Sequence, residues 1–360
     1  MEARFRRADG LYRRDGPAGR LGAAAHLWPF SQALAATLHL AGIAELAGSD
    51  QAHAADAALR RSLEALERYR DPCGAYGSDP PGRREVDVYY DDNAWVGLAL
   101  VQLERLRPGA GWLHRAAELF AFATTGWDHR TDVPSPGGVF WLLQGRGRGR
   151  SNHDRNTVST APNAALGLHL RQLLGAAASR RAADEPAVTP ETMCAWVQSA
   201  LGERPGAPAD GLFFDKIRGD GSVDRTLWSY NQGSMVAVEV LLARGAAGQS
   251  RALHLGRAEA IARRALDRWG RGWQRQPPAF IAITMRNLLM LHGPTGDGTL
   301  RERISGELAW LSDLAWDRWR GRGDLFSASG SGAATLLDQS AAVQLLALAC
   351  WPPELYDRLA

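Results

Sequence analysis

Helical periodicity recurs from one end of this 360-residue chain to the other, and strand signals are scarce. Apolar residues repeat at helical spacing in twelve stretches, which are 2–14, 27–44, 51–70, 91–107, 110–126, 158–176, 189–203, 229–244, 250–269, 278–292, 299–319 and 335–350. The first stretch is the weakest because Gly10 interrupts it. The pattern therefore predicts an all-α fold.

The links between these stretches alternate in length. Links after even-numbered stretches are mostly short, whereas links before them are mostly long and rich in Gly, Pro and aromatic residues. The long links are 71–90, 127–157, 204–228, 270–277 and 320–334. This alternation predicts six helical hairpins in a ring, an (α/α)6 barrel formed by a single domain over residues 1–360. The long loops would meet at the N-terminal ends of the inner helices, where free N–H groups and positive dipole ends favour a site.

The composition of the stretches predicts two concentric layers. Residues 94–101 carry no charge, and residues 235–242 contain a single charged residue, Glu239. Odd-numbered stretches carry mixed charge on one face, as residues 60–68 and 259–267 show, and this pattern is typical of an outer amphipathic helix. We therefore expect the even-numbered helices to form the inner ring.

Two adjacent carboxylates open the fourth stretch, where Tyr89 to Trp95 reads YYDDNAW. Asp91 and Asp92 repel each other, so the pKa of one is expected to rise beside the charge of the other. Their side chains point about 100° apart on a helix and could address different sides of one bond. Glycoside hydrolysis needs one ionised and one protonated carboxyl, and aromatic rings stack on sugars. An N-cap pair without chemistry is the alternative, which the aromatic flanks and the loop context disfavour.

Polar and aromatic side chains at other helix starts and in the longest loop could bind a sugar. Trp28 opens the second stretch, Asn163 lies near the start of the sixth, and Trp141 lies in the loop 127–157. Tyr230, Asn231 and Gln232 open the eighth stretch. Amide side chains offer both donors and acceptors to hydroxyl groups, although each could equally cap a helix or pack in the core.

Other function classes find little support. The net charge of +3 gives no reason to expect a nucleic-acid partner, and the Arg-Gly run 145–150 is too short and isolated to suggest one. The three cysteines show neither metal spacing nor a disulfide framework. No apolar run reaches the roughly 20 residues of a membrane span. Residues 1–19 lack the apolar core of a signal peptide, so a cytoplasmic location is expected as the sequence stands.

Tyr89 to Trp95, followed by Tyr230-Asn231-Gln232-Gly233, resembles glycoside hydrolase family 76, the endo-α-1,6-mannanase family. Residues 137–141 (GGVFW) and 337–339 (LDQ) are also similar to that family. The resemblance implies an (α/α)6 barrel, a retaining mechanism and α-1,6-mannan as the carbohydrate partner. It implies Asp91 as nucleophile and Asp92 as acid/base, without metal or organic cofactor. The candidate substrate-binding residues are Trp28, Tyr90, Asn93, Trp95, Trp141, Asn163, Tyr230, Asn231 and Gln232. Family members are typically exported, which would require a leader upstream of Met1.

Two alternatives remain open. A sugar 2-epimerase on the same barrel would use histidines, and His153, His169 and His292 would have to gather in the cleft. A catalytically silent glycan-binding barrel would need no carboxylate pair. The dyad His153-Asp154 has no serine or cysteine motif beside it. The oligomeric state is not indicated by the sequence.

Overall fold

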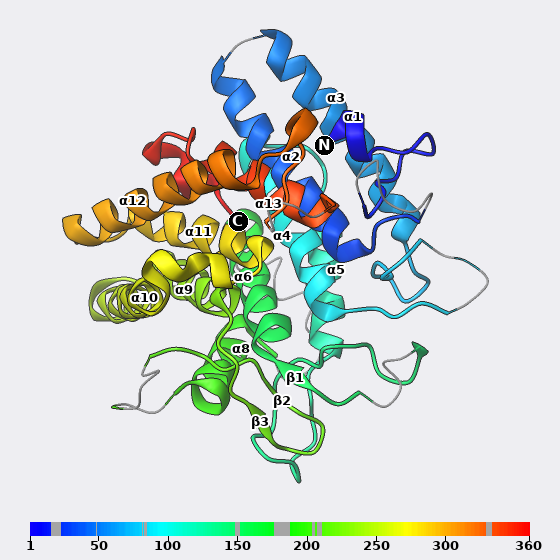
Figure 1. The fold of residues 1–360 in the computed structure, drawn as a ribbon. Coiled ribbons are helices and arrows are strands. Elements are labelled where there is room, and N and C mark those ends of the chain that lie inside the picture. Colours follow the sequence, from blue (N-terminus) through cyan, green and yellow to red (C-terminus); the bar gives the residue numbers. More distant parts are fainter. Residues whose placement is uncertain are drawn as a thin grey trace.

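The computed structural model describes residues 1–15, 23–47, 49–80, 82, 85–147, 152–175, 188–203, 206, 211–328 and 333–360. Its inner ring consists of α2 (Leu27–Ala47), α4 (Tyr90–Leu106), α6 (Thr157–Leu174), α9 (Ser229–Arg244), α11 (Pro278–His292) and α13 (Leu336–Leu348). Each of these helices packs against the next, and α13 returns to α2, so the ring is closed. The all-α barrel predicted from periodicity and loop lengths is confirmed (Figure 1).

Outer helices cover the ring. They are α3 (Ser49–Leu66), α5 (Leu113–Thr125), α8 (Pro190–Trp196), α10 (Gly248–Trp269) and α12 (Gly298–Leu314), and each packs against the inner helix that precedes it. A π-helical segment continues α8 (η3, Val197–Leu201) and another continues α12 (η5, Ala315–Trp319). Short 3-10 segments are η1 (Glu67–Tyr69), η4 (Gly270–Arg275), η6 (Arg322–Asp324) and η7 (Pro353–Arg358). Figure 1 shows α10 and α12 at the periphery.

Burial explains which helix occupies which layer. Nearly every side chain of α4 and α9 is buried, which fits sequences without a charged face. By contrast, α10 buries one apolar stripe that includes Ile261 and Leu266, and its charged face lies outside. Leu11, Tyr12 and Phe30 extend the barrel core at the N-terminal end of the chain. Among the described residues, no helix combines the length and apolar character needed to cross a membrane.

The helix predicted over residues 2–14 is wrong beyond its first turn. Only α1 (Glu2–Phe5) is helical, and the chain then turns back so that Arg6 pairs with Tyr12 in an antiparallel bridge. Gly10 lies in this turn with φ 85°, a conformation that glycine adopts without steric cost. The Tyr12 hydroxyl donates a 2.6 Å hydrogen bond to Glu2, which closes the turn against α1.

A small antiparallel sheet in the loops was not predicted. It consists of β1 (Arg155–Asn156), β2 (Lys216–Ile217) and β3 (Val223–Asp224), with Asn156 opposite Lys216 and Lys216 opposite Asp224. Figure 1 shows the three strands close together at the lower edge of the view. Because β1 leads directly into α6, the sheet fixes the loop that precedes α9 beside the start of an inner helix.

Candidate active site

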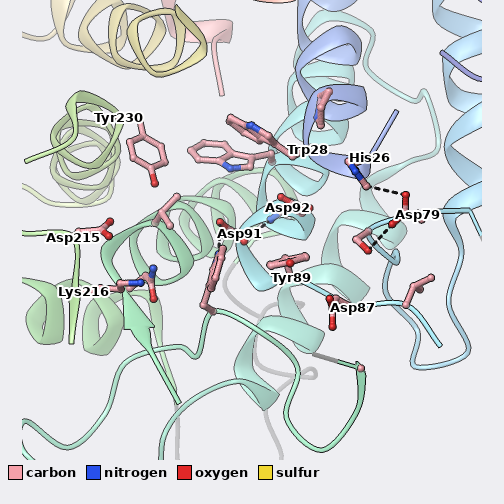
Figure 2. A pocket seen from close by; sticks show the side chains of 18 of the residues that line it. His26, Trp28, Asp79, Asp87, Tyr89, Asp91, Asp92, Asp215, Lys216 and Tyr230 are labelled. Carbon is pink, nitrogen blue, oxygen red and sulfur yellow. Dashed lines mark hydrogen bonds and ion pairs between the residues drawn. The ribbon is translucent and has the colours of Figure 1, made fainter. Parts of the chain in front are cut away.

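A cavity of about 870 Å³ lies where the inner helices begin. The first turns of α2, α4, α6, α9 and α11 contribute to its wall, as expected for the loop-rich end of the barrel. Its aspartates are Asp79, Asp87, Asp91, Asp92 and Asp215, and its aromatic residues are Trp28, Tyr89, Trp95, Trp141, Trp228, Tyr230 and Phe280. Figure 2 shows Asp91 and Asp92 near the middle, with Asp215 and Tyr230 on one side and His26 and Asp79 on the other.

Asp91 lies in the first turn of α4 and accepts two hydrogen bonds. The backbone N–H of Asp92 donates to Asp91 Oδ1 at 3.0 Å, and Trp141 Nε1 donates to Oδ2 at 3.1 Å. Burial raises the pKa of Asp91 to about 6, while these hydrogen bonds act in the opposite direction. The two hydrogen bonds therefore favour the ionised form of Asp91, and burial disfavours it.

Asp92 is the less acidic member of the pair. Its side chain is buried, and burial raises its pKa well above the usual value. The negative charge of Asp91 raises the pKa of Asp92 further, and Asp79 adds a smaller effect of the same sign. The pKa values of both carboxyls are thus raised, and that of Asp92 is raised further. Two such carboxyls can share one proton, and one ionised carboxyl beside one protonated carboxyl is what acid-assisted displacement requires.

A continuous aromatic wall faces this pair. The ring centroids of Trp28 lie 6.0 Å from Trp95 and 6.5 Å from Phe280. Phe280 stacks on Tyr230 at 3.9 Å and meets Trp228 edge-on at 5.5 Å. Such rings present flat apolar faces on which the C–H faces of sugars can pack.

Asp215 is one of the acidic groups of the cavity that were not among the predicted site residues, as are Asp79 and Asp87. Asp215 lies directly before β2, and burial raises its pKa to about 6, while the adjacent Lys216 lowers it. Lys216 Nζ forms an ion pair with Asp154 Oδ2 at 2.9 Å and lies 5.6 Å from the centroid of the Trp141 ring. The sequence carried a signal for Asp215, because Phe213 and Phe214 precede it in a long loop as tyrosines precede Asp91.

The structure places Trp28, Trp95, Trp141 and Tyr230 on the cavity wall, but it does not place all the predicted sugar contacts there. Tyr90 is buried and stacks on Phe122, with ring centroids 4.6 Å apart. Its position follows from the helix period, which turns residue 90 away from the face that presents residue 91. A direct contact between Tyr90 and the substrate is therefore not supported by its position.

The predicted amide side chains hold the backbone instead. Asn93 accepts from Tyr76 N at 2.8 Å and donates to Tyr76 O at 3.0 Å. Gln232 makes the same reciprocal pair with Phe213, at 2.8 Å for both bonds. These buried amides satisfy loop groups that no regular structure pairs, so the predicted sugar contacts are not supported by their positions.

Two further amides lie behind the site. Asn163 donates to Tyr90 O at 3.2 Å and to Ser159 O at 2.8 Å, which ties α6 to the start of α4. Asn231 is fully buried, and its side chain lowers the pKa of Asp215. Neither residue lines the cavity. Asn163 is therefore placed to position the segment that carries Asp91 and Asp92.

The histidines that an epimerase would need, His153, His169 and His292, do not line the cavity. His26, at the cavity rim, pairs with Asp79 through Nδ1 and Oδ1 at 2.8 Å. His169 is buried in α6 and contacts Arg105, and His292 ends α11. His153 packs near Phe140. Among the described residues, no group of three His, Cys, Asp or Glu side chains could hold a metal ion.

Comparison with known proteins points to glycoside hydrolysis, as the carboxyl pair in the aromatic cavity does. The sequence matches the family model of glycosyl hydrolase family 76 over residues 64–272, more than half of the chain. No curated protein matches the sequence.

Solved structures resemble the whole barrel. A Bacteroides thetaiotaomicron family 76 glycoside hydrolase described as a mannosidase has a TM-score of 0.79 at 19% identity, covering 97% of this chain and 95% of the other. A second family 76 enzyme, from a bovine strain of that species, has a TM-score of 0.78 at 19% identity, covering 97% and 75%. An inactive α-1,6-mannanase variant from Salegentibacter sp., in complex with α-1,6-mannotriose, has a TM-score of 0.73 at 16% identity, covering 97% and 95%.

Proposed function

We propose that this chain, which belongs to glycosyl hydrolase family 76 and is a glycosidase, cleaves α-1,6-linked mannan-type backbones by a retaining double displacement at Asp91 and Asp92. One observation carries the proposal. Two consecutive carboxyls, Asp91 half-buried and Asp92 buried, both have raised pKa values and lie in a cavity walled by aromatic rings. An ionised nucleophile beside a protonated acid is what the first step of such a reaction needs.

In the first step the Asp91 carboxylate attacks the anomeric carbon while Asp92 protonates the departing glycosidic oxygen. The bonds from Trp141 and from the Asp92 amide hold Asp91 in place for this attack. Formation of the glycosyl ester removes the negative charge of Asp91. The pKa of Asp92 then falls, because that charge helped to raise it. Asp92, now ionised, can take a proton from water as the water attacks the ester.

The mannanase structures support the choice of substrate and residues. The Salegentibacter α-1,6-mannanase binds α-1,6-mannotriose as a variant inactivated by replacing two consecutive aspartates. Asp91 and Asp92 are two consecutive aspartates in this chain, at the start of an inner helix of the same fold. We assign them the corresponding chemistry.

Six further cavity residues are assigned to sugar binding. Trp28, Trp95 and Phe280 offer stacking faces for mannosyl rings. Asp215 and Lys216 can accept from and donate to hydroxyl groups on the side opposite His26. Burial, with the nearby charges of Asp215 and Asp91, raises the pKa of Tyr230, so its hydroxyl stays protonated and can donate.

The test is incubation of purified protein with linear α-1,6-mannan and its oligosaccharides, with reducing ends and product sizes measured. Release by wild type and none by Asp92→Asn would support the proposal, and product sizes would separate endo from exo action. If wild type releases nothing from mannan but cleaves another α-linked glycan, the substrate assignment is wrong. Binding of mannooligosaccharides without cleavage of any glycan would favour the silent barrel.

A further inference from the structure

A second cavity, of about 500 Å³, lies beside the catalytic one. It is formed where α10 ends, between the segment before α9 and η4, which precedes α11. Arg225, Arg268 and Arg275 line it together with Trp228 and Trp269. We propose that this arginine cavity binds a phosphate group carried by the glycan. The identity of the carrier as a glycan rests on the proposed function.

The charge of the lining argues for an anion. Three guanidinium groups line the cavity, and none of its described lining residues is acidic. Arg268 and Arg275 are exposed, and no hydrogen bond or ion pair joins the guanidinium group of either to another described residue. Arg225 lies 3.9 Å from Glu203, at the limit of an ion pair, and 5.0 Å from the centroid of the Phe214 ring. These cations remain available to a ligand.

Nearby carboxylates are already paired with other arginines. Asp224 Oδ2 accepts from Arg218 at 2.7 Å. Asp267, next to Arg268 in the chain, accepts from Arg303 at 2.7 Å. The negative charges of Asp224 and Asp267 are therefore balanced by Arg218 and Arg303, and they do not neutralise the arginines that line the cavity.

Phosphate fits this lining better than a carboxylate does. A phosphate monoester carries roughly −1.5 to −2 charge near neutral pH and has three strong acceptor oxygens. Guanidinium groups donate to such oxygens in pairs, and three of them exceed what a single carboxylate charge can balance. Gln276 adds a neutral donor, because its Oε1 accepts from Ser229 N at 2.9 Å and its amide NH₂ remains.

The two cavities share a wall but differ in charge. Trp228 lines both of them and meets Phe280 of the catalytic cavity edge-on. The catalytic cavity carries Asp79, Asp91 and Asp215, which disfavour a phosphate there. A glycan lying across Trp228 would therefore place a neutral sugar at Asp91 and its phosphate-bearing unit against the arginines.

The first test is direct binding, measured by calorimetry on the whole protein. The ligands are mannose 6-phosphate, mannose, inorganic phosphate and glucuronate. The proteins are wild type, the double variant Arg268→Gln/Arg275→Gln, each single variant, and the control Arg60→Gln/Arg301→Gln, which removes two exposed arginines from α3 and α12. Thermal unfolding checks that each variant is folded, and the single variants serve if the double variant is not.

Wild type and the control pair should bind mannose 6-phosphate at least about tenfold more tightly than mannose, and the arginine variants should lose most of that difference. Binding should weaken at high salt because exposed charges are screened. Equal affinity for mannose and mannose 6-phosphate, or equal binding by wild type and the double variant, would overturn the proposal. Tighter binding of glucuronate than of mannose 6-phosphate would overturn the choice of phosphate. Inorganic phosphate bound as tightly as mannose 6-phosphate would overturn the glycan as its carrier.

A turnover assay separates this inference from the proposed function. Wild type is given neutral and phosphorylated α-1,6-mannan, and the ratio of kcat/KM values is compared with that of Arg268→Gln/Arg275→Gln. Preference for the phosphorylated mannan in wild type, reduced about tenfold in the variant, supports the inference. Cleavage of neutral mannan without any such preference leaves the proposed function intact and contradicts the inference. Phosphate-dependent binding without cleavage of any mannan contradicts the proposed function alone.

Discussion

Trp141 Nε1 donates a 3.1 Å hydrogen bond to Asp91 Oδ2, so a residue of the loop between α5 and α6 holds the carboxylate at the start of α4. The backbones are joined at the same place, where Tyr90 N donates to Trp141 O at 3.0 Å. The indole bond favours the ionised carboxyl and opposes the effect of burial on its pKa. The acidity of Asp91 therefore depends on how this loop is seated.

Removing that bond should move the pH dependence of catalysis. In Trp141→Phe the pKa of Asp91 should rise above its value of about 6, because the variant loses a hydrogen bond that lowers this pKa while burial still raises it. The acid limb of kcat/KM against pH should shift to higher pH, and activity near neutral pH should fall about tenfold. Trp316→Phe, a change at an exposed tryptophan of η5, is the control. An unshifted limb would show that Trp141 does not set this ionisation.

Replacing Asp215 should shift the acid limb of kcat/KM in the opposite direction, to lower pH. Its negative charge raises the pKa of Asp91, so Asp215→Asn should lower that pKa and extend activity to lower pH. The variant should also raise KM, since a hydrogen-bonding group for the sugar is altered. Asp220→Asn, in the exposed turn between β2 and β3, is the matched control. Identical pH profiles for Asp215→Asn and wild type would show that the charge of Asp215 does not affect the ionisation of Asp91.

Replacing Asp92 should separate stability from activity. Burial raises its pKa in the folded state, so the folded chain holds this proton to higher pH than the unfolded chain does. Stability is then lost as pH rises above the unfolded pKa of about 3.9 and stays lower above the folded pKa. Asp92→Asn should raise the melting temperature at pH 7 relative to wild type, with the gain vanishing near pH 4. Turnover should fall at least about a thousandfold. A variant that unfolds more easily at pH 7 would contradict this reading of the carboxyl.

Gln232 should matter for stability more than for affinity. Gln232→Ala leaves Phe213 N and O without their buried partners, so unfolding free energy should fall by about 2–4 kcal/mol. Urea unfolding measures this directly. Gln274→Ala, an exposed glutamine in η4, should change it little. A large rise in KM without loss of stability would restore a direct sugar contact for Gln232.

The barrel could be predicted from the sequence because the helical spacing of apolar residues is visible within each stretch. The helices predicted at 229–244 and 278–292 match α9 and α11 to the residue. The stretch 2–14 failed because a glycine inside an apolar pattern can be a weak helix residue or a turn, and Gly10 forms the turn.

The site was less predictable than the fold. Asp91 and Trp141 could be found because aromatic flanks and loop length mark them in the sequence. Asp215 also follows two aromatic residues in a long loop, but its place in the cavity depends on β1–β3, whose two-residue strands leave no periodicity to read. Asn93 and Gln232 were interpreted as sugar contacts because an amide suits both roles. Their pairing with Tyr76 and Phe213 favours the backbone role, and the sequence does not show that pairing.

The most direct test of the central claim is the anomeric configuration of the first product. Wild type is mixed with an α-1,6-mannooligosaccharide, and proton NMR follows the newly formed reducing end before it mutarotates. A double displacement through Asp91 predicts that the α-anomer appears first and the β-anomer only later. Initial release of the β-anomer would show single displacement by water, and Asp91 could not then be the nucleophile.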